Sequence, residues 1–148
     1  MARINWSRLI LGGVVAAIIM FFTDGFIHER LVRADWRAVY AGLRVAEPEP
    51  HGMSMVYFGM YELGRGLISM LFYATMRTHF GPGPKTAVIA AIAGWIAFSL
   101  AGPAQFIPLG FFSTTLWMKV GAMHLVTSIL ATITGAAMYK DAARPVTA

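Results

Sequence analysis

A few ionisable and amide side chains interrupt otherwise apolar stretches of the sequence, and these residues could do chemistry. Asp24 and His28 are four positions apart, so on a helix they share one face and can share a metal ion or a proton. Glu62 and His124 could complete a set of four carboxylate and imidazole ligands, which suit zinc, iron, copper or manganese. The cation of Arg65 and the amide of Gln105 are also candidates. The candidate ligand-binding residues are therefore Asp24, His28, Glu62, Arg65, Gln105 and His124.

A structural interpretation competes with the metal site. Glu62 and Arg65 are three positions apart, and a buried arginine needs a carboxylate partner. Such a pair would use Glu62, and His124 would then be a neutral, hydrogen-bonded core residue. Because no compact motif such as H-E-x-x-H is present, the sequence favours a structural polar network, and no cofactor is favoured. Metal binding by Asp24, His28, Glu62 and His124 remains the alternative.

Several other chemistries lack the residues that they need. The chain has no cysteine, which excludes disulfides, thiol catalysis and zinc–thiolate sites. It contains neither a G-x-S-x-G nor an S-x-x-K motif, so serine acyl transfer has no support. The sequence therefore favours a protein that is not an enzyme.

Composition and the placement of charge indicate where the candidate residues lie. Of 148 residues, 57% are hydrophobic and only 13% are charged, whereas soluble domains carry about 25% charged residues. Residues 86–118 contain no formal charge. This pattern excludes a soluble globular domain, a disordered chain and a nucleic-acid-binding domain, although the net charge is +5. In a membrane protein, basic excess reports orientation and lipid contact.

Four segments are long and apolar enough to be membrane-spanning helices of about 20 residues. They are predicted at about 9–27, 54–76, 86–109 and 115–139. Pro103, Pro108 and Gly110 divide the long uncharged stretch, and Ser113 offers an N-cap for the restart. A short amphipathic helix at about 35–44 is predicted to lie on the membrane surface. The predicted fold is an all-α, single-domain four-helix membrane bundle over residues 1–148.

The small and polar residues of each predicted span share one face, which predicts that they point into the bundle. The candidate residues fall between the midplane and the outer surface, which predicts a polar cavity there. Basic residues in the termini and the 77–85 loop slightly outnumber those on the other side, so the termini are expected to be cytoplasmic. The first span is expected to be a retained helix rather than a cleaved signal peptide, because no A-x-A-like site follows it.

One turn carries a family resemblance. The run Phe80-Gly81-Pro82-Gly83-Pro84-Lys85-Thr86, with Asn5-Trp6 and Ala34-Asp35-Trp36, resembles a group of uncharacterised, small bacterial four-helix membrane proteins. The resemblance implies a single domain in the bacterial inner membrane. It implies no activity and transfers no functional residue.

Two classes of function follow from these patterns. The favoured class is a non-enzymatic accessory or lipid- or ligand-binding bundle, whose partners are the bilayer and either further copies of the chain or a larger membrane complex. The alternative is a proton-coupled small-molecule transporter or a metal-dependent membrane enzyme that uses Asp24, Glu62 and His124. The first is favoured because the predicted cytoplasmic half has no polar path, and a conduit needs one.

Overall fold

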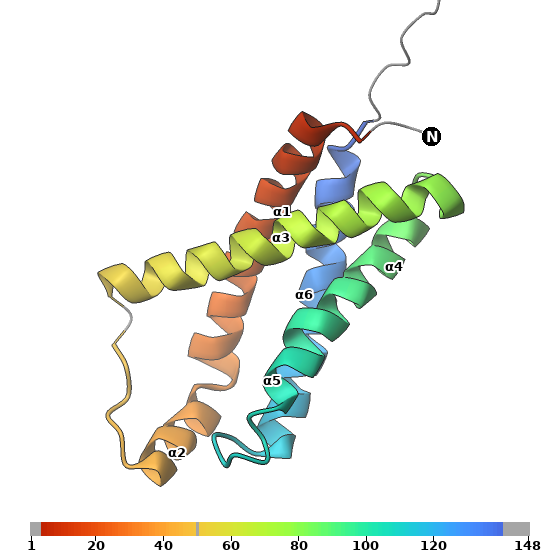
Figure 1. The fold of residues 1–148 in the computed structure, drawn as a ribbon. Helices are drawn as coiled ribbons and strands as arrows, with labels where there is room; N and C mark the ends of the chain where they lie inside the picture. The colour runs from red at the N-terminus through yellow and green to blue at the C-terminus, as the bar shows by residue number, and fades with distance from the viewer. Residues whose placement is uncertain (1–3, 50, 141–148) are drawn as a thin grey trace, which may run out of the picture.

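The computed structural model describes residues 4–49 and 51–140, and none of these residues lies in a strand. Long helices dominate the chain (Figure 1). They are α1 (Trp6–Phe26), α3 (Gly52–Phe80), α4 (Pro84–Trp95) and α6 (Thr114–Ala137). A π-helical turn, η1 (Ile27–Leu31), continues α1, and another, η2 (Ile96–Ala101), joins α4 to the short α5 (Gly102–Ala104). Helix α2 (Arg33–Leu43) lies in the connection to α3.

Within the described residues, three helices are long and apolar enough to cross a membrane. They are Trp6–Leu31, Pro84–Ala104 and Thr114–Ala137, which overlap the first, third and fourth predicted spans. Helix α3 contains the predicted span 54–76 and is longer than the other three, with 29 residues. It does not reach the same hydropathy, because Glu62 and Arg65 lie in its central part.

The long helices pack in a ring in which α1 and α4 each contact both α3 and α6. Helix α3 runs across the others, and its N-terminal half extends beyond α1 (Figure 1). That half has Met53, Tyr57 and Phe58 among its exposed side chains, although all three are apolar or aromatic. The other half of α3 is bound into the core through Met70 and Tyr73.

Glycines bring the backbones into direct contact in the part of the bundle where the start of α1 lies beside the end of α6. A Cβ added to Gly12 would lie 2.6 Å from the Gly135 carbonyl oxygen, and one added to Gly66 would lie 2.3 Å from the Gly13 carbonyl oxygen. Small residues at such crossings are typical of membrane helices, because they allow close van der Waals contact. Beside them Met20 and Met70 are buried to 1% exposure or less. We call this part the closed end.

Proline shapes the other end of α4. In a π-helix each carbonyl accepts from the N–H five residues ahead, so the Phe98 carbonyl faces Pro103, which has no N–H. The Tyr61 hydroxyl donates to that carbonyl at 3.2 Å. After α5 a turn with Gly110 at φ +77° leads to the Ser113 side chain, which caps α6 by accepting from the Leu116 N–H at 3.1 Å. The predicted break and restart are therefore confirmed.

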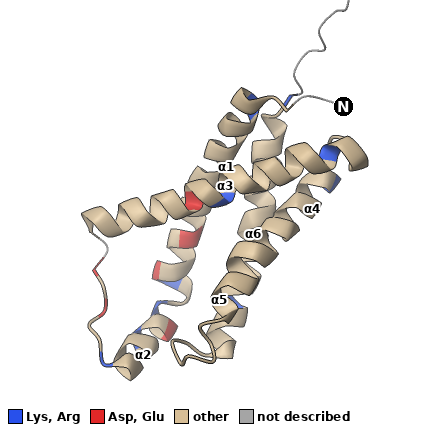
Figure 2. Ribbon diagram, in the orientation of Figure 1, with Lys and Arg blue, Asp and Glu red and all other residues tan. Residues whose placement is uncertain are grey.

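The connection between α2 and α3 is held by exposed charges (Figure 2). Glu47 pairs with Arg33 at 3.3 Å and with Arg37 at 3.0 Å. Helix α2 begins at Arg33, two residues before the predicted start, and ends at Leu43, where Arg44 adopts a left-handed conformation. The Asp35 carboxylate near the start of α2 pairs with Lys119 of α6 at 2.9 Å.

Candidate functional site

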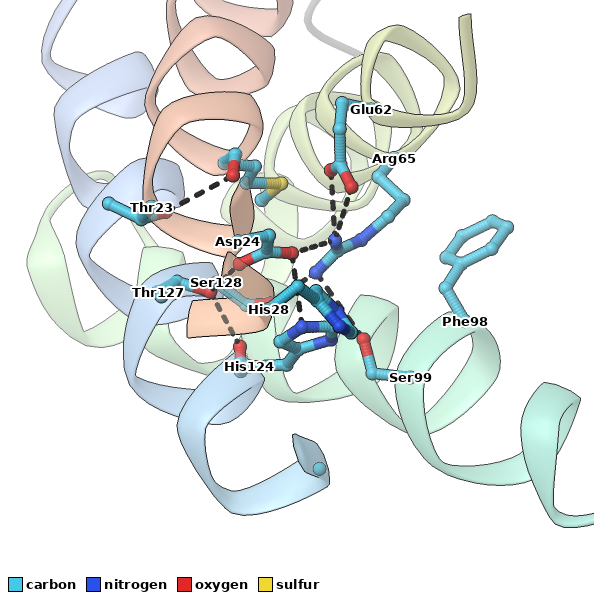
Figure 3. A network of polar contacts seen from close by, with 12 residues as sticks. Thr23, Asp24, His28, Glu62, Arg65, Phe98, Ser99, His124, Thr127 and Ser128 are labelled. Carbon is cyan, nitrogen blue, oxygen red and sulfur yellow. Dashed lines mark hydrogen bonds and ion pairs between the residues drawn. The ribbon is translucent and has the colours of Figure 1, made fainter. Parts of the chain in front are cut away.

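A buried arginine lies at the centre of the candidate site (Figure 3). The Arg65 side chain of α3 is only 3% exposed. Its Nη1 donates to Asp24 Oδ2 on α1 and to both carboxylate oxygens of Glu62, at 2.9 and 2.8 Å. Charge-assisted bonds of this kind are the strongest that a side chain makes. Two carboxylates from two helices thus meet on one guanidinium nitrogen.

The second terminal nitrogen of Arg65 reaches the other half of the ring. Its Nη2 donates to Ser99 Oγ of η2 at 3.3 Å and to Ser128 Oγ of α6 at 3.2 Å. Both serines are buried. One side chain therefore cross-links α1, α3, η2 and α6, and the two π-helical turns flank the cluster that it forms.

Asp24 connects Arg65 to α6. Its Oδ1 accepts a hydrogen bond from Thr127 Oγ1 at 2.9 Å. Its Oδ2, which also accepts from Arg65, lies 3.5 Å from His124 Nε2. Nε2 of His124 is buried and has no hydrogen-bond partner. Because buried polar atoms are normally paired, this nitrogen is the unusual feature of the cluster.

His28 links the cluster to α2. The Trp36 indole N–H donates to His28 Nδ1 at 2.8 Å. Because the indole nitrogen only donates, Nδ1 must be the acceptor, and the proton of a neutral His28 lies on Nε2. The rings of His28 and His124 meet edge to face with centroids 5.4 Å apart. On α2, Trp36 stacks on Tyr40, whose pKa is raised by partial burial and by the nearby Glu47 carboxylate.

The structure brings five of the six predicted site residues into one cluster: Asp24, His28, Glu62, Arg65 and His124. Gln105 does not join them, because it is exposed and its Nε2 donates locally to the Gly102 carbonyl at 2.9 Å. It follows Pro103 at the end of α5, where the chain leaves the bundle.

The predicted site residues did not include the hydroxyls that complete the cluster or the indole that orients His28. Thr127 and Ser128 follow His124 by three and four positions, so helical spacing already placed them on its face. Ser99 lies four positions before Pro103, but this spacing alone does not indicate its partner. Trp36 is eight positions from His28, and the π-helical turn brings the two together.

The cluster is not arranged as a metal centre. Among residues 4–49 and 51–140, no group of three or more His, Asp or Glu side chains could hold a metal ion. The Arg65 guanidinium lies where the Asp24 and Glu62 carboxylates meet, and a cation there leaves no place for a metal. Asp24, His28, Glu62 and His124 are therefore not a ligand set in this structure.

A separate hollow of about 520 Å³ lies between α2 and the chain that leads into α6. We call it the α2–α6 groove. Its walls are mostly apolar, with Asp35 as their charged residue. They are formed by Asp35, Ala38, Val39, Gly42, Leu43, Gly110, Phe111, Phe112, Ser113 and Leu116. The sequence predicted a cavity at the polar cluster and did not indicate this groove.

A basic edge borders the groove. Leu43 lines it, and the next residue, Arg44, is exposed at the end of α2. Arg30 is exposed at the other end of the same segment. In contrast, Arg33 and Arg37 are paired with Glu47. One exposed basic residue, Arg44, therefore directly follows a residue of the apolar groove wall.

No protein-family model, curated protein or solved structure matches the chain, so its function is inferred from the polar cluster and the α2–α6 groove.

Proposed function

We propose that the chain is an integral four-helix membrane bundle in which α3 is the fourth crossing. At about 1.5 Å per residue its 29 residues extend about 43 Å, so α3 is longer than the hydrocarbon thickness of about 30 Å and has length to spare for the tilt at which it crosses the other helices. Glu62 and Arg65, which lower its hydropathy, are buried and paired inside the bundle. The exposed part of its N-terminal half is apolar, as a lipid-facing surface should be.

In this proposal α2 lies at the outer surface of a bacterial inner membrane and the termini are cytoplasmic. The exposed Arg37 lies on α2 outside the apolar stripe of that helix, as expected for a helix at a membrane surface. The closed end then faces the cytoplasm, and the polar cluster lies in the outer half. The resemblance of the 80–86 turn to bacterial inner-membrane proteins supports the choice of membrane.

We propose further that the protein acts by binding and not by catalysis, and that its ligand is a phospholipid in the α2–α6 groove. The observation that carries this proposal is the groove itself. The hollow has a volume of about 520 Å³ and is open on one side, so an acyl chain can lie along it without being enclosed. Its apolar walls, with Val39 and Phe112 among them, suit an acyl chain.

The basic edge supports a phosphate-bearing headgroup. Arg44 directly follows Leu43, and in this proposal the acyl chain lies against Leu43 while the headgroup binds the Arg44 guanidinium. Guanidinium groups bind phosphate oxygens through paired hydrogen bonds. A phospholipid would satisfy both the apolar wall and the basic edge.

The closed end favours binding over transport. The Gly12–Gly135 and Gly13–Gly66 contacts join backbone to backbone. A conduit needs polar or water-lined walls, and side chains beside these contacts, such as Met70, are apolar and buried. The metal-dependent alternative loses support because the Arg65 guanidinium lies between the two carboxylates that it requires.

A groove-filling substitution tests lipid binding. Gly42 lines the groove, has an ordinary helical conformation, and a Cβ added there would meet nothing within 4 Å. We expect Gly42→Leu to fold normally, because the side chain enters open space, and to lose co-purifying phospholipid as counted by native mass spectrometry. Gly25→Leu is the matched control, because Gly25 is also open but does not line the groove.

A second variant tests the headgroup contact. Arg44→Gln should reduce retention of phospholipid while leaving retention of an uncharged diacylglycerol unchanged, because only the phosphate interacts with the guanidinium. If Gly42→Leu retains as much phospholipid as Gly25→Leu, the groove is not the binding site and the proposal is wrong.

A further inference from the structure

The buried cluster carries an excess of negative charge. Its ionised groups are two carboxylates, Asp24 and Glu62, and one guanidinium, Arg65, and all three are less than 10% exposed. Their formal sum is one negative charge. The exposed Glu29 pairs with Arg33 at 3.4 Å and belongs to the surface. A net buried charge is costly in a low-dielectric interior, and two carboxylates that share a site favour uptake of a proton.

The groups that face this charge come from every element packed around it. Helix α1 contributes Asp24, η1 contributes His28, and α6 contributes His124. Helix α3 contributes Glu62, Arg65 and Tyr61, the ring of which lies 5.6 Å from the Arg65 guanidinium carbon. The contribution of η2 is the hydroxyl of Ser99, and its residues Ile96–Ala101 include no titratable side chain.

Among these groups, His28 is a poor acceptor for an additional proton. Its Nδ1 already accepts the Trp36 N–H, and its Nε2 carries the proton of the neutral ring. His124 differs, because its Nε2 is unpartnered and directed at Asp24 Oδ2 at 3.5 Å. The acceptors that remain are the two carboxylates and His124, and a proton shared among them belongs to the group as a whole.

We propose that the Asp24–Glu62–Arg65–His124 cluster binds one exchangeable proton at neutral pH, which cancels its excess charge. His28, half-buried and edge-on to His124, lies between the cluster and α2, and in this proposal the proton exchanges on that side past the His28 ring and not through its occupied Nδ1. The closed end, with its backbone contacts at Gly12 and Gly66, blocks the other side. The cluster is therefore a proton-binding site with access from one side. This inference does not depend on lipid binding.

Counting protons in folded protein tests the site. Between about pH 6 and pH 10, wild type should release about one proton per chain more than Glu62→Gln. The variant has one carboxylate and one guanidinium, so it is neutral without a bound proton. Glu29→Gln is the matched control, because Glu29 is exposed. It should release as many protons as wild type. Equal release by wild type and Glu62→Gln would overturn the proposal.

Thermal unfolding gives the same comparison a second measure. A proton held more tightly in the folded protein than in the unfolded chain stabilises the fold at low pH, and this stabilisation is lost as pH rises. The thermal unfolding midpoint of wild type should therefore decrease as the pH is raised above neutral, and the midpoint of Glu62→Gln should decrease less.

A measurement on wild type alone keeps the proposal falsifiable if Glu62→Gln does not fold. At about pH 8, exposed carboxylates are ionised and exposed histidines are neutral. Infrared spectroscopy should then show a protonated carboxyl band, or ¹⁵N-histidine spectra should show one imidazolium. A wild-type protein with neither signal would refute the proposal.

Discussion

The two ends of the bundle are held together by opposite means. At the closed end, helices pack backbone to backbone because glycine has no side chain. Gly12 meets Gly135 there, and Gly13 meets Gly66. At the polar end, helices are joined because one long side chain, Arg65, reaches partners on four elements. The closed end should therefore be sensitive to added atoms, and the polar end to removed ones.

The comparison also separates structure from site. At the closed end, the contacts at Gly12, Gly66 and Gly135 bring backbone against backbone. At the polar end, the hydrogen bonds of the cluster hold the helices together, yet the His124 Nε2 atom has no hydrogen-bond partner. The α2–α6 groove lies between α2 and the 110–116 segment. Candidate binding features thus lie toward one end of the molecule.

The largest effect is expected at the polar end. Arg65→Met removes the cation and leaves Asp24 and Glu62 as buried, unpaired carboxylates. Breaking a buried ion pair in this way costs about 3–5 kcal/mol. We expect the free energy of unfolding, measured by denaturant titration in detergent micelles, to fall by about that amount.

A charge-matched variant supplies the control. Arg65→Met combined with Asp24→Asn and Glu62→Gln contains no buried charge, so it should recover part of the loss. If this triple variant is no more stable than Arg65→Met alone, the cost lies in packing around Arg65 and not in unpaired charge.

An intermediate effect is expected at the closed end. Gly66→Ala adds a Cβ 2.3 Å from the Gly13 carbonyl oxygen and 2.7 Å from the Ala17 nitrogen, so backbone must move. Overpacking of this kind costs about 1–3 kcal/mol, which thermal unfolding in micelles would show as a lower midpoint. The neighbouring variant Gly64→Ala meets nothing within 4 Å and should leave the protein equally or slightly more stable. Equal midpoints for both variants would contradict the account of the closed end.

The smallest effect is expected for the exposed ion pair near the groove. Lys119→Met breaks the contact with Asp35, in which both side chains are at least 35% exposed. Such pairs contribute about 0–1 kcal/mol, because water and salt screen them. Unfolding in low and high salt should therefore differ little between wild type and Lys119→Met. A loss as large as that of Arg65→Met would show that this pair anchors α2 to α6.

Much of the polar end could be predicted because helical spacing and burial act locally. Asp24 and His28 lie on one face by their separation, and Glu62 and Arg65 pair at three positions, as expected. A buried charge must also meet an opposite charge somewhere, which brings Asp24 to Arg65. Gln105 departs from the prediction because Pro103 and the turn that follows lead it out of the bundle.

Other features depend on how helices cross, and spacing along one helix does not contain that information. Ser99, which lies in η2, reaches Arg65 on another helix. Trp36 of α2 meets His28 of η1 across the bend at Val32. The α2–α6 groove joins residues about 70 positions apart, so no local pattern could indicate it.

The sequence by itself determined that this chain is helical and rich in apolar segments, because hydropathy and helical period are properties of neighbouring residues. It also determined that Arg65 requires a carboxylate partner. Only the tertiary structure decided that this cation would meet two carboxylates and two serines at once. It also decided that α3 would cross the other helices, because crossing geometry follows from the contacts that glycines such as Gly66 permit between distant helices.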